Sequence, residues 1–169
     1  MDFSGVTRGA VAGAAATAPM TLFMTLAHRA LPMTERYPLP PRQVTERASE
    51  RSGVELPRTE GRTLAVTLLA HFAYGAATGA LYGSRPPAAV PKKTLAAAMD
   101  GALFGLVVWD VSYLGLLPAL GLLPPATLHP WRRNALMISA HIVWGGSLGA
   151  ILSLRDASHA FTREPARHQ

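Results

Sequence analysis

The residues best able to do chemistry in this chain are two histidines inside matching apolar segments. Residues 70–80 read AHFAYGAATGA and residues 140–150 read AHIVWGGSLGA, so a histidine, an aromatic residue and two glycines recur in the same order. An imidazole changes its charge between about pH 5 and 8, and it also binds metals and haem iron. His71 and His141 are therefore the first candidates for a functional site.

A carboxyl group and two tyrosines are expected near these histidines. Counted from the loops on one side, Asp110, His71 and His141 lie eight or nine residues deep in their apolar segments. This depth corresponds to about 12 Å at about 1.5 Å per helical residue. Tyr113 follows Asp110 by three residues, and Tyr74 follows His71 by three. These residues predict a buried polar cluster whose protonation would change the attraction between helices, as in a proton switch or relay.

Other uses of the histidines stay open. Each imidazole can simply donate a hydrogen bond to a neighbouring helix, or both can bind a small-molecule ligand of unknown identity. His71 and His141 can also form the axial pair of a b-type haem, with the glycine one turn after each making room for the ring. A transition metal would need both histidines and Asp110 to converge. We expect no metal and no cofactor, with haem as the alternative.

Long apolar segments position these residues in a membrane. Hydrophobic residues make up 49% of the 169-residue chain and charged residues only 15%. Crossing a bilayer takes about 20 mostly apolar residues. Four stretches qualify: Gly9–Leu26, Leu64–Tyr82, Thr94–Leu116 and Ala135–Leu154. The sequence therefore predicts one all-α integral membrane domain, 1–169, with four transmembrane helices and the lipid bilayer as its partner.

The four helices are predicted to form two tandem hairpins. The histidine segments are offset by 70 residues, and a weaker match joins RGAVAG at 8–13 to DGALFG at 100–105. The expected parts are repeat one at about 5–85, repeat two at about 94–155, an extramembrane loop at 32–62 and a tail at 156–169. Each unit crosses the membrane twice, so the second and fourth helices run parallel in a 2+2 repeat.

Small residues and one ion pair are expected to hold the helices together. Glycines four residues apart let helix backbones approach closely. Two such pairs follow the histidines: Gly75 with Gly79, and Gly145 with Gly149. These faces can serve internal packing or a homo-oligomer. The repeat alignment puts Asp100 at the position held by Arg8, so we expect these two side chains to pair across the pseudo-twofold axis.

The loops predict a surface helix and a membrane anchor. Gln43–Ser52 contains good helix formers with alternating charges and few large apolar residues, which favours a short, solvated surface helix. Trp131, Arg132 and Arg133 stand at the start of the fourth apolar run. Tryptophan and arginine are the residues expected at headgroup depth, so this group predicts an interfacial anchor.

Charge and composition exclude several classes of function. The net charge is +6 and the pI about 10.5, but the basic residues stand at the ends of apolar runs, where they meet anionic headgroups. No nucleic-acid motif accompanies them, so we expect no nucleic-acid partner. The chain has no cysteine, which rules out disulfides and thiolate metal sites. No hydrolase, metalloprotease or phosphate-binding motif is present, so we do not expect an enzyme.

Part of the sequence resembles a known family. The run GLLPP at 121–125, followed by Pro130-Trp131, Asn134 and HIVW at 141–144, resembles the YagU-like bacterial inner-membrane proteins. PLPPR at 38–42 is similar to their first loop. The resemblance implies a multi-pass protein of the bacterial inner membrane with no established activity and a link to acid tolerance. It favours cytoplasmic termini, an orientation that the distribution of positive residues does not settle.

These observations predict a membrane protein of unknown biochemical activity with a stress or acid-tolerance role that depends on the buried histidine and aspartate cluster. The alternatives are a small proton-coupled transporter or channel subunit and a b-type haem-binding membrane protein.

Overall fold

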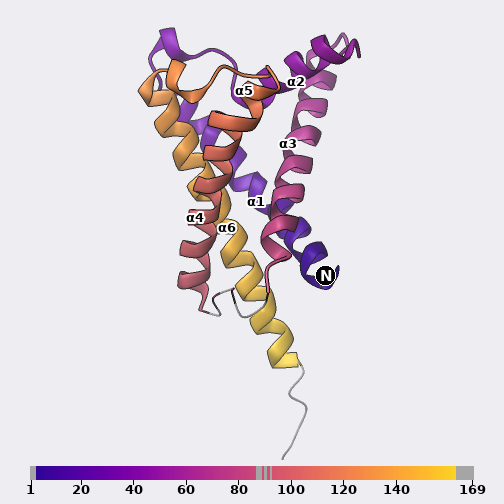
Figure 1. The fold of residues 1–169 in the computed structure, drawn as a ribbon, viewed down its shortest axis with the longest axis vertical. Coiled ribbons are helices and arrows are strands. Elements are labelled where there is room, and N and C mark those ends of the chain that lie inside the picture. Colours follow the sequence, from indigo (N-terminus) through magenta and orange to yellow (C-terminus); the bar gives the residue numbers. More distant parts are fainter. Residues whose placement is uncertain (1–2, 87–88, 90, 92, 163–169) are drawn as a thin grey trace, which may run out of the picture.

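The computed structural model describes residues 3–86, 89, 91 and 93–162, and the regular elements in this part of the chain are helices (Figure 1). Four spans are long and apolar enough to cross a membrane: Ser4–His28, Glu60–Gly83, Thr94–Ala119 and Trp131–Leu154. The predicted all-α class is therefore confirmed for the described residues, and four of its helices have the length and composition of the spans of a multi-pass membrane protein.

The long helices extend beyond the predicted stretches. The first span belongs to α1 (Phe3–His28), the second is α3 (Glu60–Gly83), and the fourth belongs to α6 (Trp131–Thr162). The predicted tail therefore begins as helix, since α6 continues to Thr162, and its last residues, 163–169, lie outside the described part. Charged residues end the apolar runs but do not stop a helix, because lysine, arginine and glutamate are good helix formers.

The third span changes its winding near its end. It begins as α4 (Thr94–Asp110) and continues through the π-helical segment η3 (Val111–Leu116) into α5 (Leu117–Ala119). The Leu117 N–H donates to the carbonyl of Ser112, five residues earlier. Pro118 has no N–H to donate, and its ring would clash with the carbonyl four residues earlier in an α-helix. The wider π turn lets the helix continue past this proline.

The four spans pack in the order α3, α1, α6, α4. α1 contacts α3, α6 contacts α4, and the central contact joins α1 to α6. Figure 1 shows α3 and α4 on opposite sides of the molecule, with the middle of α1 and the lower part of α6 between them. The outer helices α3 and α4 make no comparable backbone contact, so the space between them is left for side chains.

Glycines set the distance between α1 and α3. A methyl group added at Gly9 would overlap the carbonyl oxygen of Gly79, and one added at Gly13 would overlap that of Gly75. The structure thus puts Gly75 and Gly79 on the face of α3 that touches α1. Any larger residue at these positions would push the two backbones apart.

A second set of glycines brings α4 against α6. Added methyl groups would overlap backbone at Gly101 and Gly145, which face each other, and at Gly149, which faces Ala97. This register differs by one helical turn from the alignment of repeats predicted above. Gly79 meets Gly9, whereas Gly149 meets Ala97 rather than the Gly101 that the alignment equates with Gly9.

Replacing Gly145 by alanine tests this contact. The added methyl group has no space between α6 and α4, so Gly145→Ala should lower the free energy of unfolding by about 1–3 kcal/mol. Gly146→Ala is the matched control, because its methyl group would reach only ordinary contact at 3.6 Å from the Ala98 oxygen. Unfolding in mixed detergent micelles measures both. Equal stability of the two variants would contradict the assignment of this interface.

Candidate functional site

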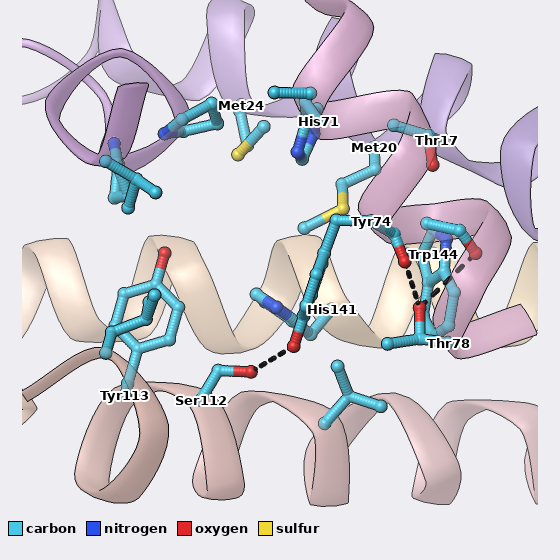
Figure 2. A pocket seen from close by; sticks show the side chains of 17 residues that line it. Thr17, Met20, Met24, His71, Tyr74, Thr78, Ser112, Tyr113, His141 and Trp144 are labelled. Carbon is cyan, nitrogen blue, oxygen red and sulfur yellow. Dashed lines mark hydrogen bonds between the residues drawn. The ribbon is translucent and has the colours of Figure 1, made fainter. Parts of the chain in front are cut away.

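A cavity of about 230 Å³ lies between the outer helices, at the depth of the two histidines (Figure 2). α1 and α6 form its back wall, α3 and the third span form its sides, and the beginning of α2 (Pro40–Ser52) covers its end. Most of its lining is apolar, including Met20, Met24 and Trp144. None of the described residues that line it is an Asp, Glu, Lys or Arg, so the site is suited to a neutral guest.

His71 and His141 both line this cavity, from α3 and α6 (Figure 2). The Nδ1 of His141 is 2.8 Å from the carbonyl oxygen of Met137. A carbonyl can only accept a hydrogen bond, so Nδ1 must carry the proton and the neutral ring keeps its lone pair at Nε2. The Nε2 of His71 is buried and has no hydrogen-bond partner within the described part of the chain. Two imidazoles thus bring unused hydrogen-bonding capacity to one apolar space.

The two predicted tyrosines lie beside the histidines in different ways. Tyr74 reaches from α3 to the third span, where its hydroxyl is 2.7 Å from the Ser112 hydroxyl (Figure 2). This hydrogen bond crosses the gap between the outer helices. Tyr113 is buried with its ring edge-on to His141, at 5.8 Å between ring centroids, and its hydroxyl lies 3.5 Å from the sulfur of Met137.

Asp110 is not brought to the predicted cluster. Its side chain is exposed on the outer surface of the third span, while Val108 and Ser112 face the cavity. Residues two apart on a helix point about 200° apart, so a residue between two cavity-facing positions must face away. Depth in the membrane alone does not determine the face of the helix on which a residue lies. No three acidic or histidine side chains converge to hold a metal in the described residues.

The glycines after the histidines lie at helix contacts rather than at a slot for a haem ring. Gly145 is pressed against Gly101 of α4, and a methyl group at Gly75 would overlap the Thr17 hydroxyl of α1. Both positions therefore belong to helix contacts. The cavity is also small for a macrocycle, since a space of about 150 Å³ holds a single benzene ring.

The first loop forms the roof of the cavity rather than a wholly solvated cap. α2 begins at Pro40, three residues before the predicted start, because proline is well suited to the first turn of a helix. Pro40, Pro41 and Val44 line the cavity. Arg42 ties this helix to the start of α3 through Glu60, at 2.6 Å.

Arg133 holds the chain that leads into the roof. Its guanidinium donates to the carbonyl oxygens of Glu35 at 2.8 Å, Tyr37 at 2.9 Å and Pro38 at 3.0 Å, and it stacks on the Tyr37 ring at 3.5 Å. The residue is only 4% exposed. Of the three predicted anchor residues, Trp131 is exposed, Arg132 approaches Glu35 at 3.7 Å, and Arg133 points inward as a structural clamp.

A second contact fixes the same loop. The Tyr37 hydroxyl is 2.9 Å from Nδ1 of His129, and the two rings are stacked. His129 precedes the fourth span, outside the apolar core. Two causes hold the pKa of the His129 imidazole below its ordinary value. Burial of the ring is the larger one, and the positive charge of Arg133 is the smaller one. Protonation of His129 is therefore unfavourable while the ring stays in its contact with Tyr37, which fixes the first loop over the cavity.

Polar side chains join the outer helices again at the opposite end. The Asp100 carboxylate accepts from the Tyr82 hydroxyl at 2.7 Å and from the Arg85 guanidinium at 2.6 Å. This differs from the predicted Arg8 partner: Nε of Arg8 donates to the Ser4 carbonyl, 3.3 Å away. The start of α1 packs on the end of α3 through Gly9. Arg8 is therefore placed with α3 rather than with α4, which carries Asp100.

Several cavity residues were missed by sequence reasoning. They are Thr17, Met20 and Met24 of α1, the roof residues of α2, Ser112 and Trp144. Ser112 carried the clearest signal, because its hydroxyl stands two residues from Asp110 inside an apolar run. Methionines and prolines gave none, since nothing in their spacing distinguishes a cavity wall from ordinary packing.

The Asp100–Arg85 pair predicts a measurable coupling. Asp100→Asn and Arg85→Gln should each lower the free energy of unfolding by about 1–2 kcal/mol, because each leaves a partly buried polar group without its partner. The double variant should lose less than the sum. In the matched cycle, Arg8→Gln and Asp100→Asn should be additive. Coupling with Arg8 and not with Arg85 would contradict the structure.

His129 predicts loss of stability in acid. The pKa of His129 is lower in the folded state than in the unfolded state. The stability that depends on its neutral form is therefore complete above the unfolded pKa, about 6.5, and is lost as the pH drops through the folded pKa. The melting temperature should therefore decrease between pH 7.5 and pH 5. His129→Gln should reduce this decrease, because glutamine can still accept from Tyr37 but does not titrate. An identical decrease in both proteins would show that His129 is not responsible.

Comparisons with protein-family models, with curated proteins and with solved structures find no match for this chain. The resemblance to the YagU-like family therefore stays a prediction, and functional inference rests on the cavity.

Proposed function

We propose that this protein binds, inside the membrane, a small neutral lipid-soluble molecule that carries a hydroxyl group. The single observation that supports this most directly is the pair of imidazoles at one apolar cavity, each with a ring nitrogen that lacks a partner in the described structure. Among the described residues, the lining offers no Asp, Glu, Lys or Arg side chain that would favour an ionic ligand.

A hydroxyl group has the chemistry to pair with either histidine. Because Nδ1 of His141 donates to Met137, its neutral ring offers Nε2 as an acceptor, and the ligand must supply the proton. A hydroxyl oxygen can also accept from His71, whose ring carries one N–H in its neutral form. A buried polar group left without a hydrogen bond costs about 1–3 kcal/mol, so occupancy by such a ligand would be favourable at both ends.

Size and position define the rest of the ligand. The cavity volume of about 230 Å³ exceeds the roughly 150 Å³ that takes up benzene, so one ring with a short substituent fits. The route of access that we propose runs between α3 and α4 from the lipid, because backbone contact between these two helices is weaker than within either hairpin. The Tyr74–Ser112 hydrogen bond crosses this route. It must open when the ligand enters, or an alkyl chain of the ligand that extends into the bilayer must pass beside it.

The proposal also includes the setting of the site. We keep the bacterial inner membrane, cytoplasmic termini and a tandem repeat of two hairpins as parts of it. The two glycine-mediated hairpins, α1 with α3 and α4 with α6, support the repeat. Both described ends of the chain lie at the opposite end of the helices from α2 (Figure 1), so one reporter fused at the C-terminus would test the orientation of both.

Acid tolerance, proton-coupled transport and haem binding stay predictions. No acidic side chain accompanies the histidines in the described lining, so a proton relay through the cavity has no carboxylate to complete it. We therefore favour ligand binding over these alternatives.

A matched pair of probes tests the hydroxyl requirement. 4-Butylphenol can donate to His141, whereas 4-butylanisole has nearly the same shape and cannot. The phenol should raise the melting temperature of the protein in detergent as its concentration increases, because a ligand that binds only the folded state stabilises it. The anisole should bind at least about ten-fold more weakly, the penalty for one buried hydrogen bond left unmade.

Two variants complete this experiment. His141→Phe should abolish the preference for the phenol. Thr78→Val is the control, because the Thr78 hydroxyl lines the cavity but already donates to the Tyr74 carbonyl at 2.9 Å, and it should keep the preference. Equal affinity for both probes in the wild-type protein would reject the proposal. A Soret band in the purified protein would instead favour haem.

A further inference from the structure

Asp110 is the one aspartate of the third span that lies deep in the membrane. It precedes Ala119, the end of the span, by nine residues, which is about 13 Å along a helix. Its side chain is exposed, and no hydrogen bond or ion pair to it occurs within the described part of the chain. In a bilayer this carboxyl group would face lipid.

Such a position is costly in an isolated subunit. A charged aspartate at the centre of a membrane helix is unfavourable by about 2.5–3.5 kcal/mol on insertion scales. Acidic residues in spans normally face a bundle interior or a partner. The cavity cannot serve as this interior, because it lies on the opposite side of the helix, at Val108 and Ser112.

The residues around Asp110 have the spacing of a helix-pairing seam. Leu103, Val107, Asp110 and Leu114 are separated by four, three and four residues, and all are exposed. A repeat of seven with this alternation is the pattern of left-handed helix pairs. The opposite face of α4 is already used, since Gly101 and Gly105 pack on α6.

We propose that this seam binds a second copy of the chain, with the two Asp110 carboxyl groups hydrogen-bonded to each other across a twofold axis. A twofold interface brings a residue near the axis opposite its own counterpart. A carboxylic acid is self-complementary, because its protonated form both donates and accepts. One surface therefore supplies both halves of the contact, and neither carboxyl group is left in lipid.

The absence of cysteine from the sequence gives a direct test. Val107→Cys, reconstituted in phosphatidylethanolamine–phosphatidylglycerol vesicles and oxidised with copper phenanthroline, should form a disulfide-linked dimer. Leu22→Cys is the matched control, since it is similarly exposed, at 61% against 57%, but on α1. Cross-linking at Val107 no greater than at Leu22 would overturn the proposal.

Substitution of Asp110 in the Val107→Cys background distinguishes the kind of partner. Asp110→Asn keeps a self-complementary amide and should keep the cross-link. Asp110→Leu should weaken association by at least about five-fold, the loss expected for a hydrogen bond between membrane helices, with the monomer still folded by thermal unfolding. Loss in both variants would indicate a cationic partner, and retention in both would show that Asp110 is not involved. Either result would overturn the proposal.

Discussion

Backbone contact through glycine is the constraint on which the rest of this structure depends. Within lipid, helices gain little from burying apolar side chains, so association depends on close packing and hydrogen bonds. Gly13 against Gly75 and Gly101 against Gly145 bring two pairs of helices together more closely than any larger residue would permit. The Trp144 indole then joins the pairs by donating to the Gly13 carbonyl at 3.1 Å. The outer helices are left apart, and that separation creates the cavity.

Side chains, rather than backbone, close the space between the outer helices. Tyr74 with Ser112 and Tyr82 with Asp100 are bridges that a single rotamer change can break. Packed glycine faces offer no such freedom. The glycine contacts between helices thus hold the histidines in place, while the side-chain bridges between the outer helices face the lipid from which a ligand would arrive. The roof depends on a different set of contacts, centred on Arg133, and lies where water can reach His129.

Much of the fold could be predicted from the sequence, because hydrophobic length is a strong constraint in a membrane. The four spans, the two histidines at one depth and the surface helix of the first loop all follow from composition and spacing. The contacts of Asp110 and Asp100 could not, since they depend on which face a residue presents and on a register that differs by one helical turn between hairpins. Pro40 and Pro41 gave no indication that they would cover a cavity. Those features are set by tertiary packing, which periodicity does not encode.

The chemistry of the site depends on where the proton of His141 resides. Its bond to the Met137 carbonyl leaves Nε2 as an acceptor aimed at the cavity, and the choice of a hydroxyl ligand follows from that. Nitrogen-15 NMR of the histidine rings, in protein reconstituted in lipid and assigned with His141→Gln, measures this directly. We predict a protonated Nδ1 and an unprotonated Nε2, whose resonance moves toward the protonated range when 4-butylphenol is added. A proton on Nε2, or no response to the phenol, would contradict the account.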